Sequence, residues 1–121
     1  MELRKELCNI GTCSKGKYTP IYFNSDQLQK LRNYGYNWVD GMDEKINARP
    51  TINQTLSFMK NDPNIQIAGI VVSKKKLGVI DRVYYKGDRF WNLLMKFGDF
   101  CKNANIISFN SKKQELYCWF D

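Results

Sequence analysis

The sequence predicts an α+β fold: an antiparallel sheet of about five strands with two to three helices packed mainly on one face. Two observations carry this prediction. In the segment 77–85, Leu77, Val79, Val83 and Tyr85 follow a period of two and share one face, as residues do in strands. In the segment 90–104, apolar residues instead recur at helical spacing. Residues 1–121 are expected to form a single domain, because a chain of 121 residues buries one core.

The first half of the chain is predicted to contain a strand, a helix and a long loop. Residues 18–23 are an aromatic and β-branched run typical of a strand. Ser25 is a candidate N-cap for a helix that ends at Gly35. Because Asn, Asp, Gly and charged residues dominate from 36 to 50, we interpret 24–50 as an insertion or loop region.

The second half is predicted to begin with a helix and a hairpin. Thr51 and Gln54 have the spacing of a capping box, followed by apolar residues at helical spacing. Residues 65–72 are β-branched and apolar, and 77–85 alternate, so the two segments form a hairpin around the lysines between them.

A further helix and hairpin are expected to complete the chain. The helix begins near Asp88, whose charge suits a helix N-terminus. Strands at 106–109 and 114–120 follow, joined by a short polar turn. With the inserted helix and the last strand set aside, the element order matches the ferredoxin-like βαββαβ arrangement, followed by a C-terminal hairpin. In that arrangement both helices cover one face of the sheet and the other face is free.

The charge balance indicates an anionic partner. The 19 Lys and Arg residues outnumber 12 Asp and Glu residues, which gives a net charge of +7 spread over both halves of the chain. Such a charge attracts phosphate backbones and acidic protein surfaces, although the codon bias of an AT-rich genome also yields basic chains. Histidine is absent, which excludes Ser-His-Asp and Cys-His catalysis and histidine-ligated metals. The longest apolar run, 67–72, is too short to cross a bilayer, so we expect no membrane partner and a cytoplasmic location.

The four cysteines are expected to be reduced. Cys8 and Cys13 have the close spacing of a zinc-binding pair, but Cys101 and Cys118 do not form a second one. Cys101 falls on the apolar face of a predicted helix, and Cys118 falls in a predicted strand. Core cysteines are therefore the favoured interpretation, and neither a metal nor a cofactor is expected.

The densest basic segment of the chain supplies the candidate binding residues. Arg82 and Tyr84 would share one sheet face, where a ring can stack on an unpaired base and a guanidinium can bind phosphate. The proposed nucleic-acid-binding residues are Lys74, Lys75, Lys76, Arg82, Tyr84, Lys86 and Arg89. A second cluster of possible contacts comprises Arg32, Tyr34, Tyr36 and Trp38. Solubilising lysines and core tyrosines are the alternative interpretation of these residues.

Three functions fit these observations, and the favoured one involves no catalytic residue. The favoured one is a small basic binding protein, rather than an enzyme, that docks on single-stranded RNA or DNA or on a nucleic-acid-processing complex. The second is an inhibitor of the kind carried by phages or mobile elements, which binds a protein such as a host defence enzyme. Trp91 and Trp119 would suit the binding patch of such an inhibitor. The third is a His-free ribonuclease that uses Tyr84 or a carboxylate for proton transfer.

Overall fold

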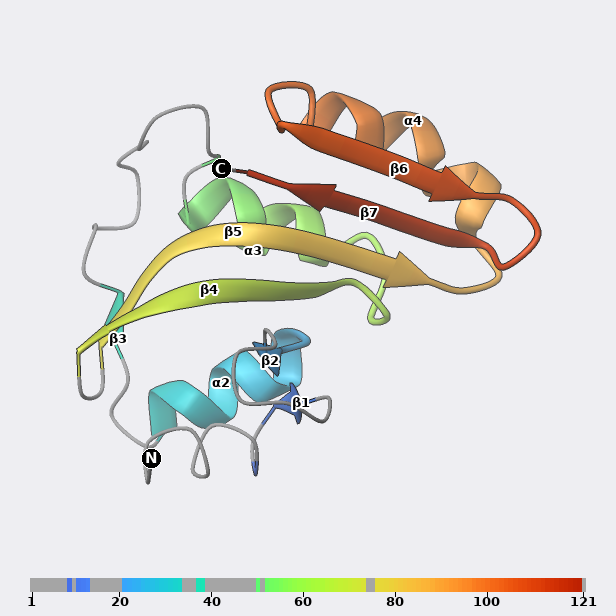
Figure 1. The fold of residues 1–121 in the computed structure, drawn as a ribbon. Helices are drawn as coiled ribbons and strands as arrows, with labels where there is room; N and C mark the ends of the chain where they lie inside the picture. The colour runs from blue at the N-terminus through green and yellow to red at the C-terminus, as the bar shows by residue number, and fades with distance from the viewer. Residues whose placement is uncertain are drawn as a thin grey trace.

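Four antiparallel strands make up the main sheet of the computed structural model (Figure 1). They are β4 (Gln66–Ser73), β5 (Lys76–Lys86), β6 (Ile106–Asn110) and β7 (Glu115–Trp119), in the spatial order β4-β5-β7-β6. The two-residue strand β3 (Asn37–Trp38) runs parallel to the start of β5. The residues that the structure describes are 9, 11–13, 21–33, 37–38, 50, 52–73 and 76–120. Over these residues the predicted α+β class and the C-terminal hairpin are confirmed.

Alternation of side chains gives the sheet two different faces. In β5, Val83 and Tyr85 are fully buried, whereas Arg82 and Tyr84 are half-buried. The hairpin of β6 and β7 turns at residues 110–115, where the Oδ1 atom of Asn110 accepts a hydrogen bond from the N–H of Lys113 at 3.1 Å. This polar turn sets the register that places alternate residues of β7 on the same two faces.

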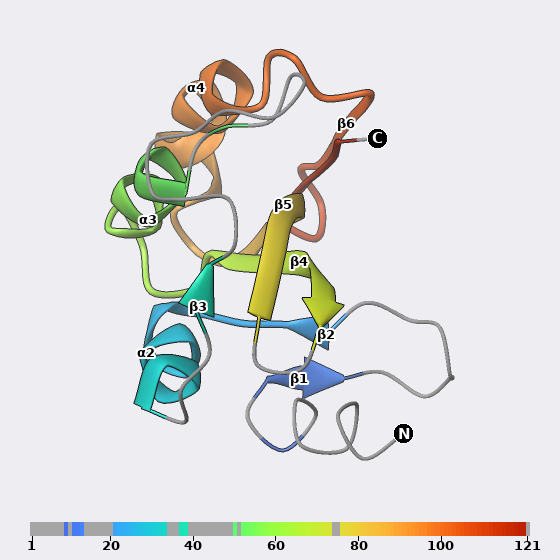
Figure 2. The same ribbon diagram turned by 90° about the vertical axis from the view of Figure 1, so that its left-hand side faces the viewer.

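The described helices all lie on one side of the sheet, as Figure 2 shows. They are α2 (Ser25–Asn33), α3 (Ile52–Met59) and α4 (Phe90–Phe100). The stripe predicted from the helical spacing is partly confirmed in α4, because Phe90 and Phe97 are buried there while Trp91 and Met95 are exposed. The helices therefore cover one face of the sheet, and the face opposite them carries no described helix.

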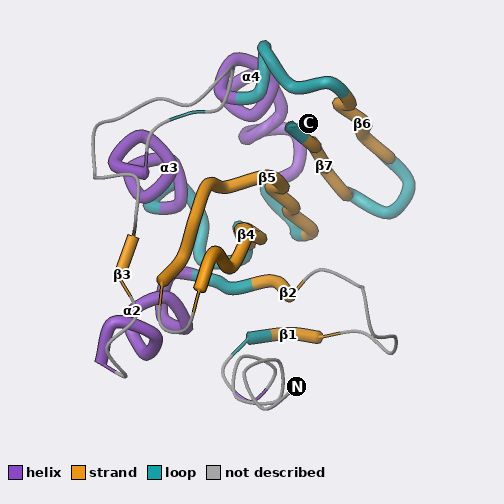
Figure 3. The backbone as a smooth tube through the Cα atoms, turned by 60° about the vertical axis from the view of Figure 1, so that its left-hand side comes forward, coloured by secondary structure: helices purple, strands orange, loops and turns teal. Residues whose placement is uncertain are grey.

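The hydrophobic core lies between this sheet and the helices (Figure 3). The ring of Phe58 in α3 stacks on Phe100 of α4 at 4.3 Å between centroids and tilts against Phe97 at 6.1 Å. Complete burial of one such apolar side chain stabilises the folded state by about 1.5–3 kcal/mol. The buried apolar side chains are Phe23, Leu28, Phe58, Met59, Ile65, Ile67, Val83, Tyr85, Phe90, Leu93, Phe97, Cys101, Leu116, Cys118 and Phe120.

A second, smaller sheet is attached to the edge of the main one. It pairs β1 (Thr12–Cys13) with β2 (Ile21–Tyr22) in antiparallel fashion. Phe23 and Ile67 join it to β4 by two backbone hydrogen bonds, of 2.8 and 2.9 Å. Aromatic side chains of the N-terminal part are thereby brought next to the main sheet.

Two helix starts differ from the sequence prediction. Asn24, not Ser25, caps α2: its Oδ1 accepts from the N–H of Gln27 at 2.9 Å, and Oε1 of Gln27 accepts from the N–H of Asn24 at 2.8 Å. The amide of Asn24 can thus form a reciprocal capping box, which a Ser25 cap would not have formed with Gln27. Helix α4 begins at Phe90, two residues after Asp88, because the hydroxyl of Tyr85 accepts a hydrogen bond from the N–H of Arg89 at 3.0 Å.

The finer topology does not confirm the ferredoxin-like arrangement. In that arrangement the first strand lies inside the sheet, next to the third, but β2 approaches β4 and β5 lies between β4 and β7. The region 24–50 was interpreted as an insertion. Within it, α2 contributes Leu28 to the core, and most of 34–49 lies outside the described residues.

None of the helices that the structure describes has the length and apolar character to span a bilayer.

Candidate functional site

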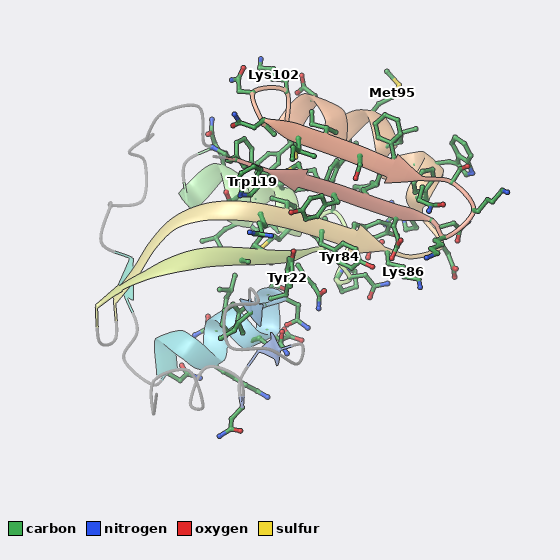
Figure 4. The ribbon with its side chains drawn as sticks, viewed as in Figure 1. Tyr22, Tyr84, Lys86, Met95, Lys102 and Trp119 are labelled. Carbon is green, nitrogen blue, oxygen red and sulfur yellow. The ribbon has the colours of Figure 1, made fainter. Side chains whose placement is uncertain are left out.

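The face of the sheet opposite the helices gathers polar and aromatic side chains. Its position follows from β5 and β7, whose alternate residues are buried toward the helices. Figure 4 shows Tyr84, Lys86 and Trp119 on this side of the ribbon, with α4 behind it. We call this surface the helix-free face; it comprises Arg82, Tyr84 and Lys86 of β5, Glu115, Tyr117 and Trp119 of β7, and Ile106, Ser108 and Asn110 of β6.

Arg82 and Trp119 are direct neighbours across β5 and β7. The guanidinium carbon of Arg82 lies 5.9 Å from the centre of the Trp119 ring, within the range of a cation–π contact. The Nη1 atom of Arg82 donates a hydrogen bond to the hydroxyl of Tyr117 at 3.3 Å. On the other side of Trp119, Ile106 is 47% exposed. A cation and an indole are thus held side by side at a partly exposed surface.

Two tyrosines form the next row of the helix-free face. Tyr84 and Tyr117 are opposite each other in register, and both are half-buried. Tyr22 of β2 adds a third ring, whose centre lies 6.0 Å from that of Tyr84 at an angle of 57°. Together with Trp119, these rings give the face several aromatic surfaces of the kind on which bases stack.

Glu115 is the carboxylate of this face. Its Oε2 atom accepts a hydrogen bond of 2.6 Å from the hydroxyl of Tyr84. Burial, and then the bond to Glu115, raise the pKa of Tyr84 from 10.0 to about 12. Lys86, which is exposed, lies opposite Glu115 in register. Glu115 therefore has a cationic residue opposite it in register and, as its hydrogen-bonded neighbour, a phenol that remains uncharged near neutral pH.

The structure brings together three of the seven residues of the predicted binding set. Arg82, Tyr84 and Lys86 share the helix-free face. Arg89 does not join them, because its guanidinium donates a hydrogen bond of 3.1 Å to the carbonyl oxygen of Asn61, in the turn after α3. Lys74 and Lys75 lie outside the described residues, and only the backbone of Lys76 is described, at the start of β5.

The second predicted cluster is described only in part. The backbone of Arg32 belongs to α2, and that of Trp38 belongs to β3. Tyr34 and Tyr36 lie outside the described residues.

None of the three residues that β7 contributes to the helix-free face was predicted as a nucleic-acid contact. They are Glu115, Tyr117 and Trp119, which alternate along β7 with the buried Leu116 and Cys118. This period of two was visible in the sequence. What the sequence could not show is the pairing of β7 with β5, which places these residues beside Arg82 and Tyr84.

The cysteines of the core lie in contact with each other. Cys101 and Cys118 are both fully buried, as predicted, and their Sγ atoms are 2.6 Å apart. The contact with Cys118, and then burial, raise the pKa of the Cys101 thiol. Cys8 lies outside the described residues, and only the backbone of Cys13 is described. Over the described part of the chain, no group of three or more potential metal ligands comes together.

Apolar side chains also reach the surface away from the helix-free face. On α4, Trp91 is 63% exposed and Met95 is 85% exposed. A groove of about 520 Å³ lies between α3 and α4, where Phe58 and Phe100 meet the polar side chains of Lys96 and Asp99.

Comparison of the chain with known protein families, with curated proteins and with solved structures finds no match.

Proposed function

We propose that this protein is a small basic binding protein, without catalysis, that holds single-stranded nucleic acid on the helix-free face. The observation that carries the proposal is the group of Arg82, Trp119 and Tyr117, in which a guanidinium lies over the Trp119 ring and donates a hydrogen bond to the Tyr117 hydroxyl at a half-buried surface. Unpaired bases stack on such rings, and cations next to them neutralise phosphates. The net charge of +7 supplies the long-range attraction. A cytoplasmic location, where such strands occur, belongs to the same proposal.

The raised pKa of Tyr84 favours binding over ribonuclease activity. A general base that works near neutral pH needs a pKa close to that pH. Burial and the bond to Glu115 move the pKa of Tyr84 the other way, to about 12. The phenol therefore suits stacking and hydrogen bonding better than proton abstraction.

Titration of the tryptophan fluorescence tests the proposal. Single-stranded RNA, single-stranded DNA and a duplex are added at about 50 mM and about 200 mM salt. We expect the single strands to quench the fluorescence, with an affinity that falls steeply as salt rises. Quenching should persist in Trp91→Phe, since Trp91 lies on the helix side, and should fall most in Trp119→Phe. Full quenching in Trp119→Phe, or no binding of any strand, would contradict the proposal.

Charge variants separate a specific face from general attraction. Lys86→Gln removes a cation from the helix-free face, whereas Lys96→Gln removes one from α4 on the helix side. The first change should weaken binding and flatten its salt dependence, and the second should do so less. Replacing Lys74, Lys75 and Lys76 by Glu tests this run of lysines in the same assay. Equal effects of the Lys86 and Lys96 variants would show that only net charge matters.

The exposed apolar residues support a second candidate, binding to a protein. Trp91 and Met95 are adjacent on the outer side of α4, and Phe109 of β6 is 63% exposed. Exposed tryptophan and methionine are typical of contact surfaces, and an inhibitor of a host defence enzyme would use such a patch. Capture of one protein partner after nuclease treatment, lost on Trp91→Ala but not on Trp119→Ala, would favour this function over the first.

A further inference from the structure

Glu115 is the one carboxylate among the described residues of the helix-free face, and it bears on which bases that face accepts. Glu115 is half-buried, and its Oε2 atom accepts the 2.6 Å bond from Tyr84. An ionised carboxylate only accepts hydrogen bonds, and each of its oxygens has room for two. The Glu115 carboxylate repels phosphate, so a nucleic-acid strand that lies on this face places a different chemical group next to Glu115. The groups that fit are the N–H donors on the edges of bases.

The spacing along β7 allows a stacked base to reach this carboxylate. Glu115 and Tyr117 are two residues apart on one strand and share a face, so their Cα atoms are separated by about 7 Å. A base lying over the ring of Tyr117 or Tyr84 therefore extends its edge toward the oxygens of Glu115. The bond from Tyr84 holds the carboxylate in place before the base arrives, which reduces the entropy lost on binding.

Among the four common bases, guanine presents two adjacent donors, N1–H and the N2 amino group. The N6 amino group of adenine and the N3–H of uracil each lie between two acceptors, and the N4 amino group of cytosine has the N3 acceptor on one side, so none of these bases offers two adjacent donors. A paired, charge-assisted contact is the strongest that a planar carboxylate makes. We propose that Glu115 selects guanine among the unpaired bases that bind the helix-free face. This inference rests on the proposed function, because it concerns the same surface.

Short oligonucleotides that differ at one base test the selection. The probes are an oligouridine, the same strand with one central guanosine, and the same strand with inosine there, which lacks the N2 amino group. We expect the guanosine strand to bind roughly tenfold more tightly than the oligouridine, and the inosine strand to lose most of that gain. Equal binding of all three would overturn the inference and leave the proposed function standing. No binding of any of them would overturn both.

Two variants identify the residue responsible. Glu115→Gln keeps the size of the side chain but makes one of its two acceptors a donor, so the preference for guanosine should fall toward unity. Asp99→Asn removes the same charge from an exposed position on α4 and should keep the preference. Circular dichroism checks that both variants are folded. A preference that survives Glu115→Gln would show that another group recognises the base.

Discussion

The hydroxyl of Tyr84 donates a hydrogen bond of 2.6 Å to Oε2 of Glu115, across the antiparallel pair of β5 and β7. This bond joins the two strands on the side of the sheet that the helices leave uncovered. It also links the aromatic part of the helix-free face to Glu115, the one carboxylate among the described residues of that face. Because the bond holds the proton of the Tyr84 hydroxyl, titration of Tyr84 reports on it.

The hydroxyl of Tyr84 is expected to lose its proton at a higher pH than an ordinary tyrosine. Burial, followed by the bond to Glu115, raises its pKa from 10.0 to about 12. Because the folded state favours the neutral phenol, the stabilisation is complete below pH 10.0 and is lost as the pH rises toward about 12. The difference in tyrosinate absorbance between the native protein and Tyr84→Phe reports this pKa. Glu115→Gln should lower it only in part, since burial is the larger cause; an ordinary value in the native protein would contradict the bond.

The hydroxyl of Tyr85 is expected to be worth about 1–3 kcal/mol. It is fully buried, donates to Oδ2 of Asp62 at 3.3 Å and accepts from the N–H of Arg89 at 3.0 Å. Tyr85→Phe leaves both partners without it, so urea unfolding should show a clear loss of stability. Tyr117→Phe, which removes a half-buried hydroxyl, should cost less; the reverse order would show that the Tyr85 contacts do not hold the start of α4.

The cap of α2 provides a third prediction. Asn24→Ala removes the side chain that accepts from Gln27 and should cost about 1 kcal/mol. Ser25→Ala is the matched control, because Ser25 is exposed and is the first residue of the helix. Chemical denaturation of the two variants should place the larger loss at Asn24. A larger loss at Ser25 would instead restore the cap predicted from the sequence.

The two sides of α4 are expected to respond very differently to truncation. Phe97 is fully buried, so Phe97→Ala should destabilise the protein by about 3–5 kcal/mol. Met95, two residues earlier, is 85% exposed, and Met95→Ala should change the free energy of unfolding by less than about 0.5 kcal/mol. Thermal unfolding compares them directly. A large loss at Met95 would mean that this side chain is covered, for instance by a second copy of the chain.

The hairpins and α4 could be predicted from the sequence because their signals are local. Alternation in 77–85 and helical spacing after Phe90 depend only on neighbours along the chain. The start of α4 could not be predicted in this way, because the hydroxyl that receives the N–H of Arg89 comes from Tyr85 of the preceding strand. A contact of this kind depends on how β5 meets the helix.

The residues of the candidate site likewise form two groups: those that a local sequence pattern could predict and those that depend on contacts between distant segments. Arg82 and Tyr84 were assigned to one face by their spacing in a single strand, and the structure places them there. Arg89 was grouped with them because it is near in sequence, yet its guanidinium reaches Asn61 on the helix side. Glu115, Tyr117 and Trp119 are 31 or more residues away from Tyr84 and became neighbours only through strand pairing.

By itself, the sequence determined the fold class, the positive charge and the faces of individual strands, because composition and periodicity act over a few residues. The tertiary structure decided which strands are neighbours, and with it that Arg82 meets Trp119 and that Tyr84 meets Glu115. The physical reason is that strand order depends on contacts between distant segments, whose free energies no local pattern encodes.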